Sequence, residues 1–188
     1  MDALLVSTLA VAIAEIGDKT QLLALVLAAR YRKPWPIVAG ILVATILNHA
    51  LAGWLGALVS GWVDPQWLRW GVVLSFLAVA AWALVPDKLD EDEAKAPRFG
   101  AFLATLVAFF LVEMGDKTQV APVVLAAQYE PLWQVVTGTT LGMVLANAPV
   151  VLLGSRFAAK LPLKAARYAA AALFAGLGLW VAAFGLPG

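Results

Sequence analysis

The chain has 188 residues, 63% of them hydrophobic and 13% charged, and its formal net charge is +1. Soluble domains are about 45–50% apolar and about 25% charged, so this composition is typical of a protein that crosses a membrane several times; it argues against nucleic-acid binding, which needs a strongly basic surface. The absence of Cys and the single His exclude disulfides, thiolate ligands and a zinc site built from several His residues, so a metal site would have to use oxygen ligands.

The first apolar segment, residues 3–29, begins like a signal peptide, with small residues at Ala10, Ala12 and Ala14. It lacks the basic start of a signal peptide, however, and apolar residues resume after residue 20. We therefore predict a single membrane helix over residues 3–29. This helix should end before Pro34, because the residue that precedes a proline is disfavoured in the helical region.

Five further apolar segments predict membrane helices. They cover residues 35–59, 67–85, 100–127, 132–154 and 168–184. The main polar stretch lies between the third and the fourth span, at residues 86–99. It contains five acidic and three basic residues and is expected to be a solvated linker.

Basic residues predict the orientation of these segments. Ten of the 13 Lys and Arg residues lie in three loops, residues 30–34, 86–99 and 155–167. Two more, Lys19 and Lys117, lie in the apolar segments, which leaves only Arg69 for the opposite side. Because cytoplasmic loops carry an excess of Lys and Arg, the three basic loops are predicted to be cytoplasmic and both termini to lie outside.

A short motif occurs twice in the chain. E-I-G-D-K-T at residues 15–20 returns as E-M-G-D-K-T at residues 113–118, 98 residues later. The same offset also matches Gln21 with Gln119, Tyr31 with Tyr129, Trp35 with Trp133, Gly40 with Gly138, and Gly56 with Gly154.

The repeat predicts two homologous halves, residues 1–85 and residues 100–188, joined by an acidic cytoplasmic linker at residues 86–99. Each half has three predicted spans, and because three is odd, the second half must be inverted relative to the first. The predicted fold is therefore an all-α integral membrane protein whose six transmembrane helices form two inverted three-helix repeats. This architecture is typical of secondary transporters, whose binding sites lie near the midplane of the membrane.

Each motif places two carboxylates and a lysine in an apolar segment, where ionisable groups are costly and generally functional. On a continuous helix, Glu15 and Asp18 would share one face, about one turn apart, and Glu113 and Asp116 would do the same in the second copy. If the two faces meet, four carboxylates converge around one point and form an oxygen cage suited to Ca²⁺ or Mn²⁺. We predict these four residues as the site for both metal and protons.

Other residues of the motifs and their neighbours are expected to support this cage. Gly17 and Gly115 would loosen the helix between the acids. Lys19 and Lys117 would either pair with the Glu four residues earlier or extend towards a watery vestibule. The remaining supporting candidates are Thr20, Gln21, Thr118, Gln119, His49 and Asn147.

His49 and Asn147 occupy matching positions of the two halves. We interpret His49 as a hydrogen-bonded residue of helix packing; alternatively, the pair lines the transport pathway.

The charges of the two motifs indicate how transport would be coupled. Four carboxylates and two lysines sum to −2 when all are ionised. One divalent cation, or two protons, would neutralise this charge, and an uncompensated charge is costly in a medium of low dielectric constant. Competition of metal and protons for the same oxygens therefore favours an antiporter.

The duplicated E-x-G-D-K-T motif, in a chain with six predicted spans and an acidic central linker, resembles the Gdt-type family of Ca²⁺/Mn²⁺:H⁺ antiporters. That family includes Golgi cation exchangers of eukaryotes and manganese exporters of bacteria. The resemblance covers essentially the whole chain, and neither motif departs from the family pattern. It implies that Glu15, Asp18, Glu113 and Asp116 bind the cation and the protons. The small size resembles bacterial members, which implies Mn²⁺ export across a bacterial inner (plasma) membrane, with Ca²⁺ as a second candidate substrate and no cofactor.

Other functions are weighed against this one. A six-span exporter of amino acids or another small solute would need a site for an amine or a carboxylate rather than four converging acids. An intramembrane hydrolase with an acid dyad would use two carboxylates, but here each Asp is accompanied by a Glu and a Lys. A passive channel would carry ions only downhill. We therefore favour a secondary active transporter in the lipid bilayer, not an enzyme, that exports Mn²⁺ in exchange for protons.

Overall fold

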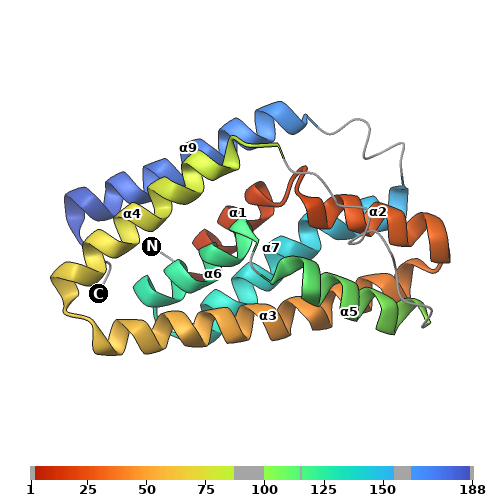
Figure 1. Cartoon of the computed structure of the whole chain (residues 1–188), viewed down its shortest axis with the longest axis horizontal. Helices are drawn as coiled ribbons and strands as arrows, with labels where there is room; N and C mark the ends of the chain where they lie inside the picture. The colour runs from red at the N-terminus through yellow and green to blue at the C-terminus, as the bar shows by residue number, and fades with distance from the viewer. Residues whose placement is uncertain (1–2, 87–99, 115, 155–161, 187–188) are drawn as a thin grey trace.

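The computed structural model describes residues 3–86, 100–114, 116–154 and 162–186 of the chain. Within these ranges the regular structure is helical, as predicted, and Figure 1 shows the arrangement of the eight helices. They are α1 (Ala3–Ala14), α2 (Lys19–Tyr31), α3 (Pro34–Trp62), α4 (Pro65–Ala83), α5 (Ala101–Glu113), α6 (Lys117–Gln128), α7 (Leu132–Leu153) and α9 (Leu163–Phe184).

Four of these helices are long and apolar enough to cross a membrane, namely α3, α4, α7 and α9. They correspond to four of the six predicted spans. The largest shift of a boundary is in α9, which begins at Leu163 rather than near residue 168, so that Lys164 and Arg167 belong to its first turns. The helix α4 begins at Pro65, two residues before the predicted start. Asp64 caps it by accepting the N–H of Gln66 at 2.9 Å, and a proline is well suited to the first helical position.

The two spans that carry the motifs are each divided into two shorter helices, in contrast to the continuous helices expected from the sequence. In the first span, α1 ends at Ala14, Gly17 has φ +83°, and Asp18 is the N-cap of α2. A positive φ is readily adopted only by glycine, and aspartate is a preferred N-cap, so the motif itself interrupts the helix. The second span is interrupted at the matching place, where α5 ends at Glu113 and α6 begins at Lys117.

The helices of the two halves interleave. The first helix of the chain, α1, packs against α7, while α5 and α6 pack against α3. Each interrupted span therefore packs against the first long helix of the other half, α7 or α3. The last long helices of the two halves, α4 and α9, run side by side along one side of the molecule, with α3 along the opposite side (Figure 1). Between α4 and α9, the buried rings of Phe76 and Phe174 stack with their centroids 6.1 Å apart.

Two glycines allow this interleaving, and their contacts match. A Cβ on Gly40 of α3 would lie 2.8 Å from the carbonyl oxygen of Phe102 in α5, and a Cβ on Gly138 of α7 would lie 2.6 Å from the carbonyl oxygen of Leu4 in α1. Cβ atoms in proteins essentially never lie within 3.0 Å of such an oxygen atom. Each glycine therefore permits a close approach of two backbones. Gly40 and Gly138 are 98 residues apart, as are Leu4 and Phe102, so the same contact occurs twice.

Candidate functional site

The first motif forms a compact buried turn between α1 and α2. The side chains of Glu15, Asp18 and Thr20 are at most 1% exposed. The hydroxyl of Thr20 donates a hydrogen bond of 2.5 Å to Oε2 of Glu15, and the backbone N–H of Gly17 donates to Oε1 of Gln21 at 2.9 Å. Gln21 therefore satisfies a backbone donor that the interruption of the helix would otherwise leave unsatisfied. Hydrogen bonds between polar atoms of the motif and Gln21 thus hold the turn in shape.

Gln21 also connects this turn to the other half of the chain. Its Nε2 donates a hydrogen bond of 2.9 Å to the backbone carbonyl of Ala146 in α7. The same side chain thus contacts the backbone of its own motif and that of the helix against which α2 packs. Gln21 was expected to support the site, and the structure gives it this double role.

The second motif is also buried, with Glu113 2% exposed and Asp116 5% exposed. Glu113 is the last residue of α5, and Asp116 accepts the backbone N–H of Gln119 through its carbonyl at 3.2 Å. Nζ of Lys19 lies 3.9 Å from Oδ1 of Asp116, so an ion pair joins the two motifs. The sequence spacing suggested a pair between Lys19 and Glu15, and did not predict this connection. Gly115 and the side chains of Lys117 and Thr118 lie outside the described part of the chain.

Two neighbouring polar residues of α3 face the end of α5. Nδ2 of Asn48 donates a hydrogen bond of 3.2 Å to the carbonyl of Phe110. Nε2 of His49 lies 4.0 Å from Oε1 of Glu113, and the His49 side chain is completely buried. Asn48 was not among the predicted site residues, although a second polar residue beside His49 in an apolar helix was a signal that could have identified it.

The expectation that His49 is a hydrogen-bonded packing residue is wrong. Neither of its ring nitrogens has a hydrogen-bond partner in the part of the chain that the structure describes. Asn147, its counterpart in the other half, does have one: Nδ2 of Asn147 donates to the carbonyl of Met143, one turn earlier in α7, at 3.1 Å. The two matching positions therefore have different surroundings.

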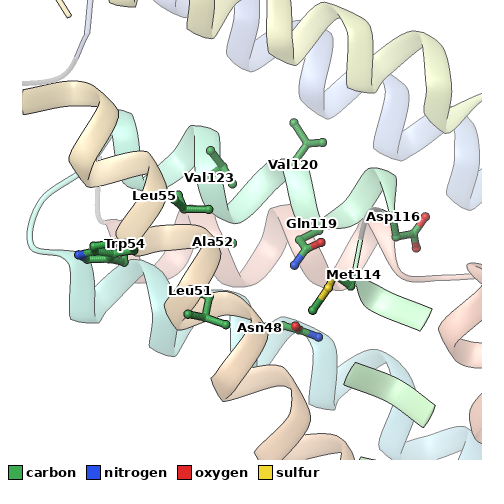
Figure 2. A pocket seen from close by; sticks show the side chains of 10 residues that line it. All are labelled: Asn48, Leu51, Ala52, Trp54, Leu55, Met114, Asp116, Gln119, Val120 and Val123. Carbon is green, nitrogen blue, oxygen red and sulfur yellow. The ribbon is translucent and has the colours of Figure 1, made fainter. Parts of the chain in front are cut away.

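A cavity of about 530 Å³ lies between α3 and α6 and reaches the second motif (Figure 2). Asn48, Gln119 and Asp116 lie towards one end of it, and Trp54 lies towards the other. The walls between these ends are apolar, and they are formed by Leu51, Ala52, Leu55, Met114, Val120 and Val123.

A second cavity, of about 540 Å³, lies between α2 and α7. Three of its lining residues, Leu25, Leu152 and Leu153, are 98 residues away from Val123, Trp54 and Leu55 of the first cavity. The two cavities thus occupy matching places in the two halves. They differ in depth. The first cavity reaches Asp116 of the second motif, whereas the described residues that line the second cavity begin at Leu25 in α2 and include none from either motif.

The carboxylates do not form a closed cage in this structure. Among residues 3–86, 100–114, 116–154 and 162–186, no three Asp, Glu or His side chains come close enough together to hold one metal ion. The continuous helices from which the cage was predicted are interrupted between the Glu and the Asp of each motif, which separates the two carboxylates of a motif onto different helix ends.

Comparisons with known proteins match almost the whole chain. The family model described as "Divalent cation/proton antiporter GDT1" matches residues 3–91 and 101–186. A Vibrio cholerae protein named "Putative manganese exporter" is 54% identical over 185 residues, which cover 98% of this chain and 92% of that protein. A GDT1-like protein of Synechocystis is 29% identical over 80% of this chain and 82% of its own length. GDT1-like protein 3 of Oryza sativa subsp. indica is 26% identical over 93% of this chain and 71% of its own length. No solved structure matches the chain significantly.

Proposed function

The chain belongs to the GDT1 family of divalent cation/proton antiporters, and from this premise we propose that it exports Mn²⁺ from the cytoplasm in exchange for protons. As a member of that family it is a transporter and not an enzyme. The observation that carries the choice of Mn²⁺ is the 54% identity, over 98% of this chain, to the Vibrio cholerae protein named as a manganese exporter. Ca²⁺ is the second expected substrate, because carboxylate and carbonyl oxygens suit both ions.

The proposal assigns binding of the cation and of the protons to Glu15, Asp18, Glu113 and Asp116. Their burial supports this assignment, since all four side chains are at most 5% exposed. An ionised carboxylate in such a place is costly unless a cation or a proton compensates it. The ion pair between Lys19 and Asp116 adds support, because it brings residues of the two motifs together.

The charge of the two motifs determines the expected exchange ratio. With both lysines charged, the four carboxylates leave −2, which one Mn²⁺ or two protons would neutralise. A carrier that crosses between states only when neutral would exchange two protons for each metal ion and would move no net charge.

The proposed architecture joins α1 with α2, and α5 with α6, into two interrupted spans. With α3, α4, α7 and α9 these give six spans in two inverted repeats, residues 1–85 and 100–188, with residues 86–99 as the linker. Interrupted helices that meet at the binding site are typical of secondary transporters. The matched contacts of Gly40 and Gly138 support the repeat. The distribution of Lys and Arg supports an orientation in the inner (plasma) membrane with residues 30–34, 86–99 and 155–167 in the cytoplasm and both termini outside.

The two matching cavities support transport by alternating access. In the proposed orientation, the cavity that reaches Asp116 lies in the outer half of the membrane, and its counterpart between α2 and α7 lies in the inner half. On the inner side, the hydrogen bond from Gln21 to Ala146 joins α2 to α7 between the cavity and the motif. We infer that this state is closed towards the cytoplasm, and that the matching residues of the outer side close in the opposite state.

Transport by the purified protein in proteoliposomes tests the proposed function. A pH gradient across the vesicles should drive Mn²⁺ against its concentration gradient, which a passive channel cannot do. Glu15→Gln and Glu113→Gln should each abolish this uphill flux, because each removes a carboxylate that binds both the metal and the proton.

The matched control is Asp90→Asn, which also neutralises one carboxylate but lies in the linker, outside the described residues. It should leave Mn²⁺ flux largely unchanged. If both Glu variants transport Mn²⁺ as the unaltered protein does, the assignment of the site is wrong; if no pH gradient drives Mn²⁺ uptake in any variant, the proposed exchange itself fails.

A further inference from the structure

His49 takes no part in the charge balance of the four carboxylates and two lysines, and its surroundings are unusual. It is the only His of the chain, its side chain is completely buried, and neither ring nitrogen has a hydrogen-bond partner among the described residues. Buried polar atoms are normally hydrogen-bonded, and an exception in a folded protein calls for a specific explanation, such as an ion that the group binds.

The position of His49 points to such an ion. Its Nε2 lies 4.0 Å from Oε1 of Glu113, a carboxylate of the second motif. A divalent transition-metal ion forms bonds of about 2.0–2.2 Å to imidazole nitrogen and to carboxylate oxygen, so a single ion can span two such atoms up to about 4 Å apart. The adjacent residue, Asn48, lines the cavity that also reaches Asp116, which places His49 one residue from a route into the site.

We propose that His49 binds the transported ion through a ring nitrogen, together with Glu113, and that this nitrogen makes the site favour Mn²⁺ over Ca²⁺. The inference rests on the proposed function, since it assigns a further ligand to the same site. It differs from the expectation that a metal site in this chain would use oxygen ligands alone.

The difference between nitrogen and oxygen ligands explains the expected preference. Ca²⁺ is bound by oxygen ligands and gains little from an imidazole, whereas divalent transition metals bind imidazole well, with affinities that rise from Mn²⁺ through Co²⁺. A site of carboxylates alone would discriminate weakly between Mn²⁺ and Ca²⁺. One nitrogen among the oxygens is sufficient to separate the two classes of ion.

The repeat gives this ligand a natural comparison. Asn147 occupies the position of His49 in the other half, offers no imidazole, and donates its amide to Met143 of its own helix. The two motifs are identical at their acidic residues, but His49, which belongs to the first half, lies beside Glu113 of the second motif, whereas position 147 holds an Asn. We therefore expect the selectivity for transition metals to depend on the pair of His49 and Glu113, to which each half contributes one residue.

Pulsed electron paramagnetic resonance of bound Mn²⁺ tests the proposal directly. Mn²⁺ is paramagnetic, and an imidazole nitrogen bonded to it modulates the electron spin echo. Because His49 is the only His, a nitrogen signal of this kind in protein purified with a tag free of histidine can come from no other imidazole. The unaltered protein should show the signal, and His49→Asn and His49→Gln should lose it.

Competition between ions provides the second readout. The variant His49→Asn gives position 49 the residue that the chain has at the matching position 147. In this variant the affinity for Mn²⁺ and Co²⁺ should fall by about ten-fold or more. The affinity for Ca²⁺ should change by less than about two-fold, because Ca²⁺ does not depend on the nitrogen. Retained Ca²⁺ binding also demonstrates that the variant is folded.

Two results would overturn the proposal. If Mn²⁺ binds to the unaltered protein without the imidazole signal, His49 is not a ligand, while the proposed function stands. If His49→Asn weakens Mn²⁺ and Ca²⁺ binding equally, His49 has a structural role and not a selective one. A protein that binds no Mn²⁺ at all would instead contradict the proposed function, and the assignment of His49 would fall with it.

Discussion

The conformation of one residue, Gly17, determines how the first motif presents its carboxylates. Its φ of +83° lies in a region that residues with a side chain rarely adopt, and a Cβ at this position would lie 2.8 Å from Cδ2 of Leu163 in α9. The backbone therefore turns between Glu15 and Asp18 only because position 17 carries no side chain. The torsion angle is the stronger requirement, since the side chain of Leu163 is 42% exposed and can move.

Gly17→Ala should consequently destabilise the protein by about 1–3 kcal/mol and strongly reduce Mn²⁺ transport, because the turn must either strain or rearrange. Thermal unfolding in detergent and flux in proteoliposomes measure the two effects. Gly61→Ala is the matched control, since a Cβ at Gly61 would meet nothing within 4 Å. Equal stability and equal flux in the two variants would contradict the role given to Gly17.

At the scale of single residues, the sequence singled out several polar side chains that the structure buries, such as Glu15, Gln21 and His49, but did not indicate which of them meet. The duplicated acids, Gln21 and His49 all stand in apolar segments, and this pattern is visible without coordinates. The pair of Lys19 with Asp116 and the contact of Asn48 with Phe110 depend on how helices from different halves pack. Spacing along one helix carries no information about such contacts, so the sequence suggested a pair within the motif instead.

At the scale of helices, the sequence predicted the long apolar elements well and the interruptions poorly. Hydrophobic content extends through both motif-bearing spans, and the residues on either side of Gly17 are apolar enough to continue a helix. The interruption is instead decided by local backbone chemistry, namely the positive φ of Gly17 and the capping of α2 by Asp18. In a prediction from sequence, the two residues that interrupt the helix, Gly17 and Asp18, count for less than the apolar residues around them, which favour a continuous helix.

The matched glycine contacts between helices lead to a prediction for both halves. Gly40→Ala and Gly138→Ala should each lower the free energy of unfolding by about 1–3 kcal/mol, because the added methyl group overpacks a contact between two backbones. The effects should be similar, since the partners Phe102 and Leu4 also occupy matching positions.

Chemical or thermal unfolding in detergent measures both glycine variants, with Gly71→Ala as the control because a Cβ there would meet nothing within 4 Å. A large effect in one half and none in the other would argue against equivalent packing of the repeats.

At the scale of the whole molecule, the two cavities should differ in their access to solvent. The chain contains no Cys, so each single Cys variant carries a unique reporter. In the state described here, a Cys at Gln119, which lines the cavity beside Asp116, should react with a water-soluble thiol reagent. A Cys at the matching residue Gln21, which is 5% exposed, should be protected.

The reactivities should change in opposite directions when Mn²⁺ or an imposed pH gradient shifts the population of states. Labelling followed by mass spectrometry measures both variants under each condition. Reactivities that rise and fall together would contradict alternating access between the two cavities.

The interruption of both motif-bearing spans has an electrostatic consequence for the four acidic side chains. Glu15 and Glu113 stand at the carboxyl ends of α1 and α5, where the helix macrodipole places roughly half a negative charge, while Asp18 and Asp116 stand at the amino ends of α2 and α6, where it places roughly half a positive charge. The backbone thus already compensates the two aspartates in part and adds to the charge of the two glutamates. If the cation binds at these four carboxylates as proposed, the four half-helices attract it first towards the glutamates.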